Sequence, residues 1–168
     1  MSSADDVLFR AILVGVGGTV VLDLWAEFLA RVMGVPATNW AMVGRWLGNM
    51  PRGRFVQRSM THAEPVRGEL AIGWVAHYVI GILYGLLLLA LWGPSWIARP
   101  TLLPPVILAW VLLASPYLIM MPGMGAGIAG AKTPKPNVTR LKALVAHSVF
   151  GLGMYAVAVV LTWVKPNA

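Results

Sequence analysis

The chain has 168 residues, of which 58% are hydrophobic and only 11% are charged. Soluble domains carry about 25% charged residues, so this composition excludes a soluble globular enzyme and indicates a membrane protein. Cysteine is absent, which excludes disulfides, thiolate metal sites and cysteine nucleophiles.

Four long apolar stretches follow one another along the chain, at about 7–33, 70–93, 102–122 and 141–164. Each is long enough for the roughly 20 residues that a membrane-spanning helix needs. They predict an all-α, polytopic membrane protein in which residues 1–168 form a single transmembrane domain, a four-helix bundle. Asp5 and Asp6 stand where a signal peptide would be basic, so we expect the first stretch to be retained as a helix.

The net charge of +7 comes from basic residues that gather beside two of the three connections. Ten lie in or next to the first and third connections: Arg31, Arg45, Arg52, Arg54, Arg58, Arg67, Lys132, Lys135, Arg140 and Lys142. Three flank the other side: Arg10, Arg99 and Lys165. By the positive-inside rule, this asymmetry predicts cytoplasmic connections and external termini. The charge therefore indicates topology and contact with anionic lipid, and argues against nucleic acid as a partner.

Asp23 and Glu27 interrupt the first apolar stretch, in VVLDLWAEFLA (20–30). A charged carboxylate in hydrocarbon is costly, so we expect partners that offset the cost. One ridge of the predicted helix collects small and polar residues at every fourth position: Gly15, Thr19, Asp23, Glu27 and Arg31. Small residues beside polar ones are typical of a close-packed interface between membrane helices.

The first connection begins with TNWAMVGRWLGNM (38–50), for which Thr38 is the expected N-cap. The pattern predicts a short helix at the membrane interface, with an apolar face made of Trp40, Val43, Leu47 and Met50. Further on, His62 and Glu64 either cap a polar site from the cytoplasm or form a solvated pair in the loop. The H-x-E pattern of zinc deaminases is excluded because its C-x-x-C partner cannot exist in this chain.

The third connection contains MPGMGAGIAGAKTPKP (121–136), which satisfies G-x-G-x-x-G and nearly completes a P-loop. Both motifs need a preceding strand, whereas an apolar helix is predicted here, so nucleotide binding is rejected. We expect the stretch to unwind the end of the third helix. Its free N–H groups, with Lys132 and Thr133, are candidates for contact with a lipid phosphate.

The second and fourth stretches share the pattern V-A-H-x-V-x-G, at 75–81 and 145–151. Either chance or a duplication of one helical hairpin explains it, and a duplication would give two parallel repeats related by an axis along the membrane normal. In that case His77 and His147 are symmetry mates. Glycine recurs around His77 at four-residue intervals, which again indicates close helix packing.

Depth along the helices links these polar residues. At 1.5 Å per residue, His77 and His147 lie about 10 Å from the cytoplasmic starts of their helices, Glu27 about 9 Å and Asp23 about 15 Å from the same side. Four polar groups in one layer favour an ion or proton site. The alternative is structural: Glu27 pairs with Arg31 within its helix, Asp23 stays protonated, and each histidine bonds a backbone carbonyl.

Three long segments carry a resemblance to a known family: GVGGTVVLDLWA, WVAHYVIG and PGMGAGIAGAKTPKPNVTRLKALVAHSVFGLGMY. Over nearly the whole chain, the sequence resembles an uncharacterised bacterial family of small four-helix inner-membrane proteins, a domain of unknown function. The resemblance implies a multi-pass protein of the bacterial inner membrane, and in that location the charge asymmetry predicts that both termini are periplasmic. It implies no activity and no site residues.

The sequence leaves three kinds of function open, and whether the protein is an enzyme stays undecided. The first is binding of a cation, a proton or a divalent metal, by Asp23, Glu27, His77 and His147. Carboxylate with imidazole suits Fe, Mn, Zn or Ni. The second is an accessory subunit that packs into a larger membrane complex or a homo-oligomer through its glycine ridges and tryptophans. The third is a membrane enzyme with a carboxylate–histidine metal centre.

Overall fold

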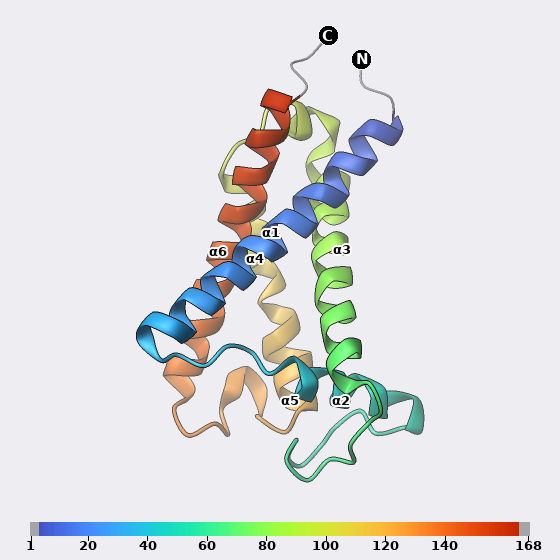
Figure 1. Ribbon diagram of the computed structural model, residues 1–168, viewed down its shortest axis with the longest axis vertical. Coiled ribbons are helices and arrows are strands. Elements are labelled where there is room, and N and C mark those ends of the chain that lie inside the picture. Colours follow the sequence, from blue (N-terminus) through green and yellow to red (C-terminus); the bar gives the residue numbers. More distant parts are fainter. Residues whose placement is uncertain (1–3, 165–168) are drawn as a thin grey trace. The chain divides into compact units, whose positions relative to one another are not determined.

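The computed structural model describes residues 4–164 (Figure 1), and every regular element in that range is a helix. The α-helices are α1 (Ala4–Met33), α2 (Trp40–Asn49), α3 (Glu69–Ala98), α4 (Leu103–Leu112), α5 (Met121–Gly123) and α6 (Pro136–Val164). Short turns of other helical types are η1 (Met50–Arg52), η2 (Pro116–Met120) and η3 (Ile128–Gly130). The prediction of an all-α protein is confirmed.

Four helices are long and apolar enough to cross a membrane: Ala4–Met33, Glu69–Ala98, Leu103–Gly123 and Pro136–Val164. The third of them runs through α4, the π-helical turn η2 and α5. The π-turn begins at Pro116, which has no N–H to continue the helical ladder. The prediction of four membrane-spanning helices is therefore met in number and length, and the helices fit a multi-pass membrane protein.

The end of α3 illustrates how local chemistry sets these boundaries. Gly93 adopts φ 74° and ψ 178°, outside helical geometry, and Pro94 starts one further turn. Glycine tolerates a positive φ without the steric cost of a Cβ, and proline suits the first position of a new helical turn. The regular part of α3 thus stops where the apolar stretch was predicted to end, at residue 93.

The described residues form two compact units. Unit 1 comprises residues 4–37, 78–111 and 146–164, and unit 2 comprises residues 38–77 and 112–145. Both ends of the described chain belong to unit 1, and Figure 1 shows the start of α1 and the end of α6 at the same end of this unit. An even number of spans requires this arrangement.

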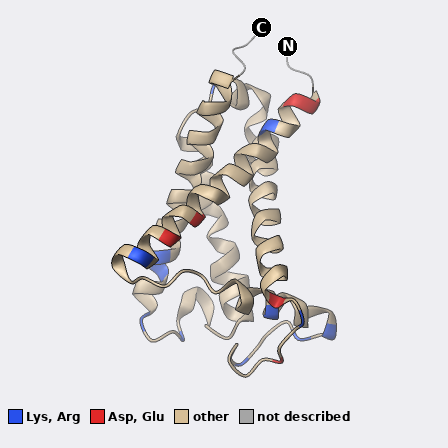
Figure 2. Ribbon diagram, in the orientation of Figure 1, with Lys and Arg blue, Asp and Glu red and all other residues tan. Residues whose placement is uncertain are grey.

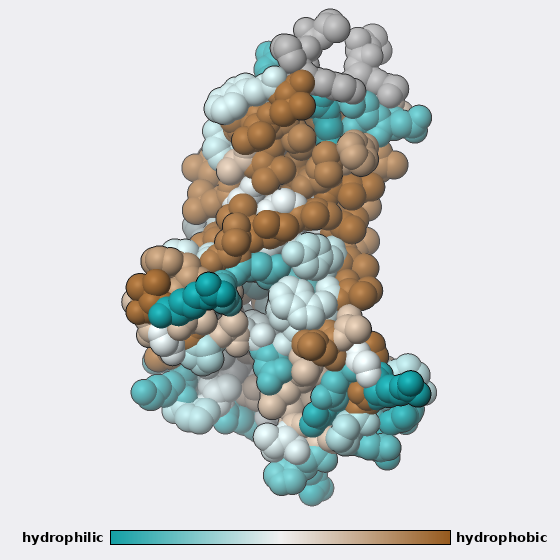
Figure 3. Space-filling view, in the orientation of Figure 1, coloured by the Kyte–Doolittle hydropathy of each residue, from teal (hydrophilic) through white to brown (hydrophobic). Residues whose placement is uncertain are grey.

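Unit 1 is packed through glycine. A Cβ at Gly15 would overlap the carbonyl of Gly81, and one at Gly85 would overlap the carbonyl of Ala11, so α1 and α3 touch backbone to backbone. Close approach at small residues is how membrane helices gain van der Waals contact without a hydrophobic driving force. Figure 1 shows α1 in blue crossing α3 in green and α6 in red, and Figure 3 shows hydrophobic side chains over the outer surface of these helices.

The glycine that ends the repeated pattern V-A-H-x-V-x-G has a similar packing role in both copies. Gly81 of α3 lies against Gly15 and Thr19 of α1, and Gly151 of α6 lies against Pro105 and Val106 of α4. Each glycine thus brings its helix close to the spanning helix that precedes it in the chain. This is what a duplicated hairpin would produce, although the duplication itself stays a prediction.

Unit 2 is built around α2. Asn39, not Thr38, is the N-cap: its side-chain oxygen accepts from Met42 N at 3.2 Å, so the predicted cap is wrong by one residue. Asparagine fills this position at least as well as threonine. The buried face also differs from the predicted one, because it consists of Val43, Gly44, Trp46 and Asn49. A Cβ at Gly44 would overlap the backbone of α3, so the absence of a side chain at this position allows α2 to pack directly against that helix.

The core of unit 2 is rich in methionine. Trp46, Met60 and Ala63 form its buried centre. Around them pack Met42, Leu47, Met50, Met120 and Met124. Flexible thioether side chains fill irregular gaps well, which suits a core made from a short helix and two connections.

Candidate functional site

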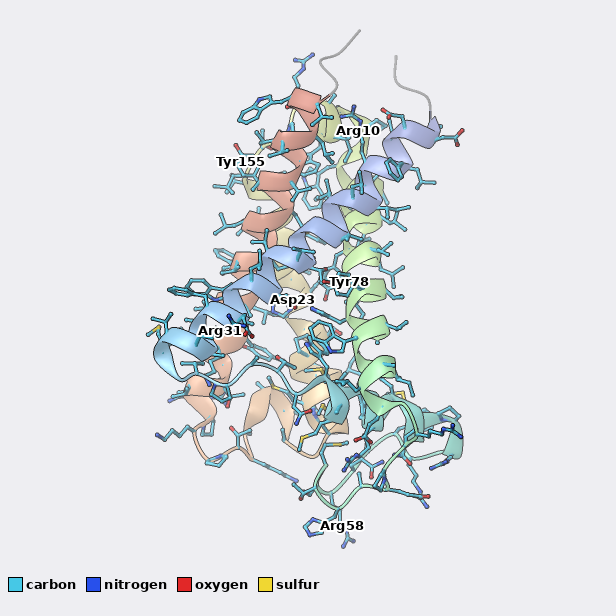
Figure 4. The ribbon with its side chains drawn as sticks, viewed as in Figure 1. Arg10, Asp23, Arg31, Arg58, Tyr78 and Tyr155 are labelled. Carbon is cyan, nitrogen blue, oxygen red and sulfur yellow. The ribbon has the colours of Figure 1, made fainter. Side chains whose placement is uncertain are left out.

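Asp23 meets a tyrosine that the sequence analysis did not single out. The hydroxyl of Tyr78, on α3, donates to Asp23 Oδ2, on α1, at 3.0 Å. Both side chains are half-buried, and Figure 4 shows them together between α1 and α3. Part of the cost of placing a carboxylate in an apolar helix is therefore offset by a hydroxyl donor.

The packing of α1 on α3 sets up this hydrogen bond. One turn before Asp23, Thr19 is fully buried and donates its hydroxyl to Gly15 O at 2.9 Å. The predicted ridge of α1 is thus confirmed at Gly15 and Thr19, both of which lie against Gly81. Figure 2 shows the uncharged middle of α1, and Asp23 is the first charged residue after Arg10.

Glu27 lies one turn beyond Asp23 but in a different environment. It forms an ion pair with Arg31 within α1, and the two side chains are 54% and 77% exposed. For Glu27, the structure therefore agrees with the structural alternative. Exposed pairs of this spacing contribute little stability, and the carboxylate needs no further partner.

His77 belongs to unit 2 and is held by aromatic rings. It is only 8% exposed, and its ring stacks on Trp40 with centroids 3.9 Å apart. The Trp74 ring meets it in an edge-to-face arrangement with centroids 5.8 Å apart. The close fit of Gly44 and Gly73 brings α2 near enough to α3 for this stacking. Trp40 was predicted on the apolar face of the interfacial helix, but contact with His77 was not foreseen.

His147 is half-buried in unit 1, next to Ser148, whose hydroxyl accepts from Trp110 Nε1 at 2.9 Å. Two of the three other predicted ligands, Asp23 and Glu27, share unit 1 with His147, whereas His77 belongs to unit 2. Within residues 4–164, no three His, Asp or Glu side chains form a group that could hold a metal ion. The structure therefore pairs Asp23 with Tyr78 within unit 1.

His62 and Glu64 lie exposed in the first connection. Glu64 pairs with Arg54 and, at 3.4 Å, with Arg52, while His62 Nδ1 lies 3.2 Å from the hydroxyl of Thr61. This is the solvated arrangement that was the alternative to a cap. A capping role for the two residues stays a prediction.

The glycine-rich third connection is folded on itself. The N–H groups of Ala126, Lys132 and Thr133 are each bonded to a carbonyl of the same segment, at 2.8–2.9 Å. The Thr133 hydroxyl donates to Gly130 O at 2.7 Å. The expectation of free N–H groups is therefore wrong at these positions. Contact of Lys132 and Thr133 with a lipid phosphate remains a prediction, and the exposed Lys132 side chain is the part still suited to it.

A polar cluster at the start of α3 was also missed. Arg45 binds Glu69 through two hydrogen bonds, at 2.7 and 2.8 Å, and reaches Met60 O at 3.3 Å. The hydrogen bond to Glu69 raises the pKa of Arg45 above its usual value, so the guanidinium stays charged. Such fork-shaped pairing fixes geometry as well as charge, and here it closes the first connection onto α3.

The partner of Asp23 had one usable signal in the sequence. Gly15 faces Gly81 and Ala11 faces Gly85, so four residues forward on α1 correspond to four residues back on α3. Because α1 and α3 run antiparallel, a partner for Asp23 is expected on α3 before Gly81, where Tyr78 carries a hydroxyl donor. This signal can be used only after it is known which residues of α1 face the glycines of α3.

A comparison with family models shows which family the chain belongs to. The family described as "Protein of unknown function (DUF2938)" matches residues 12–161. No curated protein and no solved structure matches. Because the family covers most of the chain, the resemblance to an uncharacterised family is confirmed, and the chain belongs to the DUF2938 family.

Proposed function

We propose that this chain is an integral membrane protein that takes up and releases a proton at Asp23. The observation that carries the proposal is the hydrogen bond from the Tyr78 hydroxyl to Asp23 Oδ2, between two membrane-spanning helices. Ionisable residues within membrane helices are costly and usually mark ion or proton pathways.

Tyrosine is a suitable partner for a carboxyl group that changes its protonation state. Its hydroxyl donates to an ionised carboxylate, and it can also donate, with a weaker hydrogen bond, to the carbonyl oxygen of a protonated carboxyl group. The contact between α1 and α3 therefore survives both states. Asp23 can exchange a proton without the helices separating, which a pair of fixed charges would not allow.

The arrangement supports a proton more than a divalent metal. Asp23 and the two histidines have the chemistry for Fe, Mn, Zn or Ni, but no group of three ligands forms within residues 4–164. Glu27 is engaged by Arg31. A membrane enzyme with a metal centre would need the same group of ligands, so the same observation argues against it.

The accessory-subunit alternative loses one of its arguments. The glycines expected to bind a partner subunit, Gly81 and Gly85, are occupied by α1 of the same chain. What remains for a partner or a second copy is the exposed apolar surface of the spanning helices, including Leu24 and Phe28, which lipid would cover equally well.

We also propose that the protein resides in the bacterial inner membrane, with the first and third connections in the cytoplasm and both termini in the periplasm. The support is the gathering of basic residues in the first and third connections. Single cysteines at residues 3 and 54 test it, because the chain has none of its own. Labelling of position 3 from the cytoplasm, or of position 54 only from outside, would contradict this orientation.

Dicyclohexylcarbodiimide, an apolar reagent that attacks protonated carboxyl groups, tests the proton site. We expect an adduct at Asp23 by mass spectrometry, and less of it as the pH rises and the carboxyl loses its proton. Glu27, exposed and paired with Arg31, is the internal control and should stay unmodified. Absence of an adduct on Asp23, or equal labelling of both residues, would count against the proposal. Stoichiometric metal that is lost in His77→Ala or His147→Ala would favour the metal alternative instead.

A further inference from the structure

The first connection carries an exposed apolar tip. Phe55 is 60% exposed and Val56 is 74% exposed, although large apolar side chains in a connection cost free energy in water. Between residues 50 and 68 the chain has one acidic residue, Glu64, and four arginines: Arg52, Arg54, Arg58 and Arg67.

Hydrogen bonds from α2 and to the end of α5 hold the backbone of this tip in place. The Phe55 carbonyl accepts from Trp46 Nε1 at 2.8 Å, and the Gln57 N–H donates to Gly123 O at 2.8 Å. A Cβ at Gly125 would overlap the carbonyls of Gln57 and Arg58, so the third connection lies directly against this segment. The backbone of residues 55–58 is therefore fixed while the Phe55 and Val56 side chains remain outside.

The same hydrogen bonds locate the tip relative to a membrane. Gly123 is the last residue of the spanning helix Leu103–Gly123, and Val56 directly precedes the residue bonded to it. Since one residue spans at most about 3.6 Å, Val56 lies within about 4 Å and Phe55 within about 7 Å of Gln57, and both are therefore near the depth at which that helix ends. That depth belongs to the headgroup layer of a bilayer.

Charge decides which lipid the tip would meet. Arg52 and Arg54 are partly neutralised by Glu64. Arg58 takes part in none of the ion pairs found within residues 4–164, and Figure 4 shows it at the outer edge of the connection. Basic residues beside apolar ones are the pattern that binds anionic lipid surfaces.

We propose that Phe55 and Val56 insert into the headgroup layer of an anionic membrane, with Arg58 and Arg54 contacting lipid phosphates. The insertion would anchor the first connection to the membrane surface that it faces. It does not depend on a proton site at Asp23, so either proposal can fail alone.

Single cysteines also test this proposal, in nanodiscs made of phosphatidylcholine alone or mixed with phosphatidylglycerol. An environment-sensitive fluorophore is attached in Phe55→Cys or Val56→Cys, and in Thr61→Cys, an exposed polar position of the same connection. With phosphatidylglycerol we expect lipids brominated near the glycerol to quench the labels at 55 and 56 severalfold more than the label at 61. Adding Arg58→Gln, or raising the salt concentration, should reduce that quenching.

Equal quenching at 55, 56 and 61 would overturn the proposal. So would quenching that is the same in both lipid mixtures and insensitive to Arg58→Gln, because the anionic lipid would then have no role. A cross-link from position 55 to another protein in native membranes, without quenching by lipid, would replace the membrane by a protein partner. All substituted side chains are exposed, so the variants should fold.

Discussion

Helices touch backbone to backbone at glycine in both units, as Gly44 does against α3 in unit 2, but unit 2 also has to hold two long connections in place. In unit 1, helices approach until their backbones touch at glycine, as Gly15 does against Gly81. In unit 2, side chains of α2 also hold the backbone of the first connection by hydrogen bonds. Trp46 donates to Phe55 O, and the fully buried Asn49 donates to Glu64 O. Helices in lipid satisfy their own backbone groups and need only close contact, whereas a folded connection must find donors elsewhere.

This difference makes the polar pair in unit 1 informative. A hydrogen bond between side chains is ordinary in a connection, where Arg54 meets Glu64 and Arg45 meets Glu69. Between two spanning helices that pack through glycine, the Tyr78–Asp23 bond is not needed for contact. That contrast is the reason for assigning it a function.

The largest effect is expected where backbone meets backbone. In Gly85→Ala, the new methyl group would overlap Ala11 O, and α1 and α3 would have to separate. Overpacking usually costs 1–3 kcal/mol, and we expect a loss of about 3 kcal/mol of unfolding free energy because backbone cannot rotate away. Unfolding in mixed detergent micelles measures it.

Gly17→Ala is the matched control for that substitution. The added group there is nearest to Cβ and both Cγ atoms of Val157, a stiff side chain in a helix, so we expect a smaller loss than where the new methyl group meets backbone. Both variants gain the same helix propensity from replacing glycine. Equal loss in the two variants would mean that the close backbone contact of α1 with α3 makes no special contribution to the stability of unit 1.

A smaller effect is expected from the donors of unit 2. Asn49→Ala removes the donor to Glu64 O, and we expect a loss of about 1–2 kcal/mol because a fully buried side chain loses its hydrogen bonds. Hydrogen exchange should become faster between residues 53 and 68 and stay unchanged where α1 packs on α3. Gln57→Ala, which removes an exposed amide donor to Arg54 O, should have little effect. Global destabilisation by Asn49→Ala would remove the distinction between the units.

The smallest effect concerns the start of α2. Asn39→Ala should cost about 1 kcal/mol, the usual contribution of an N-cap, because Met42 N loses its acceptor. Thr38→Ala is the control and should change nothing. Thermal unfolding followed by the fluorescence of a label in the first connection would separate the two, and a larger loss in Thr38→Ala would restore the predicted cap.

Much of the fold was predictable because apolar length and four-residue spacing are local properties. They predict the four spans, the end of regular helix near residue 93 and the packing ridge at Gly15 and Thr19. The N-cap was missed by one residue because adjacent Thr38 and Asn39 both suit that position. The buried face of α2 depends on the small Gly44 next to α3, which periodicity of apolar residues does not reveal.

The candidate site was predictable only in part. Counting residues along a helix estimates the depth of Asp23 and His77, but it says nothing about the direction in which each side chain points. Two groups at one depth can therefore lie on different faces, and the predicted ligands do not form a group within residues 4–164. Tyr78 was missed because a tyrosine in a membrane helix is ordinarily counted among interfacial aromatic residues.

Infrared spectroscopy of the Asp23 carboxyl group tests the central claim most directly. Asp23→Asn should remove one carboxyl band that responds to pH, and Glu27→Gln should leave that band in place. Tyr78→Phe keeps the ring and deletes only the hydroxyl, so we expect the same band at a higher frequency, because the carbonyl has lost its hydrogen bond. A band unchanged by Tyr78→Phe, or one that persists in Asp23→Asn, would contradict a proton site formed by these two residues.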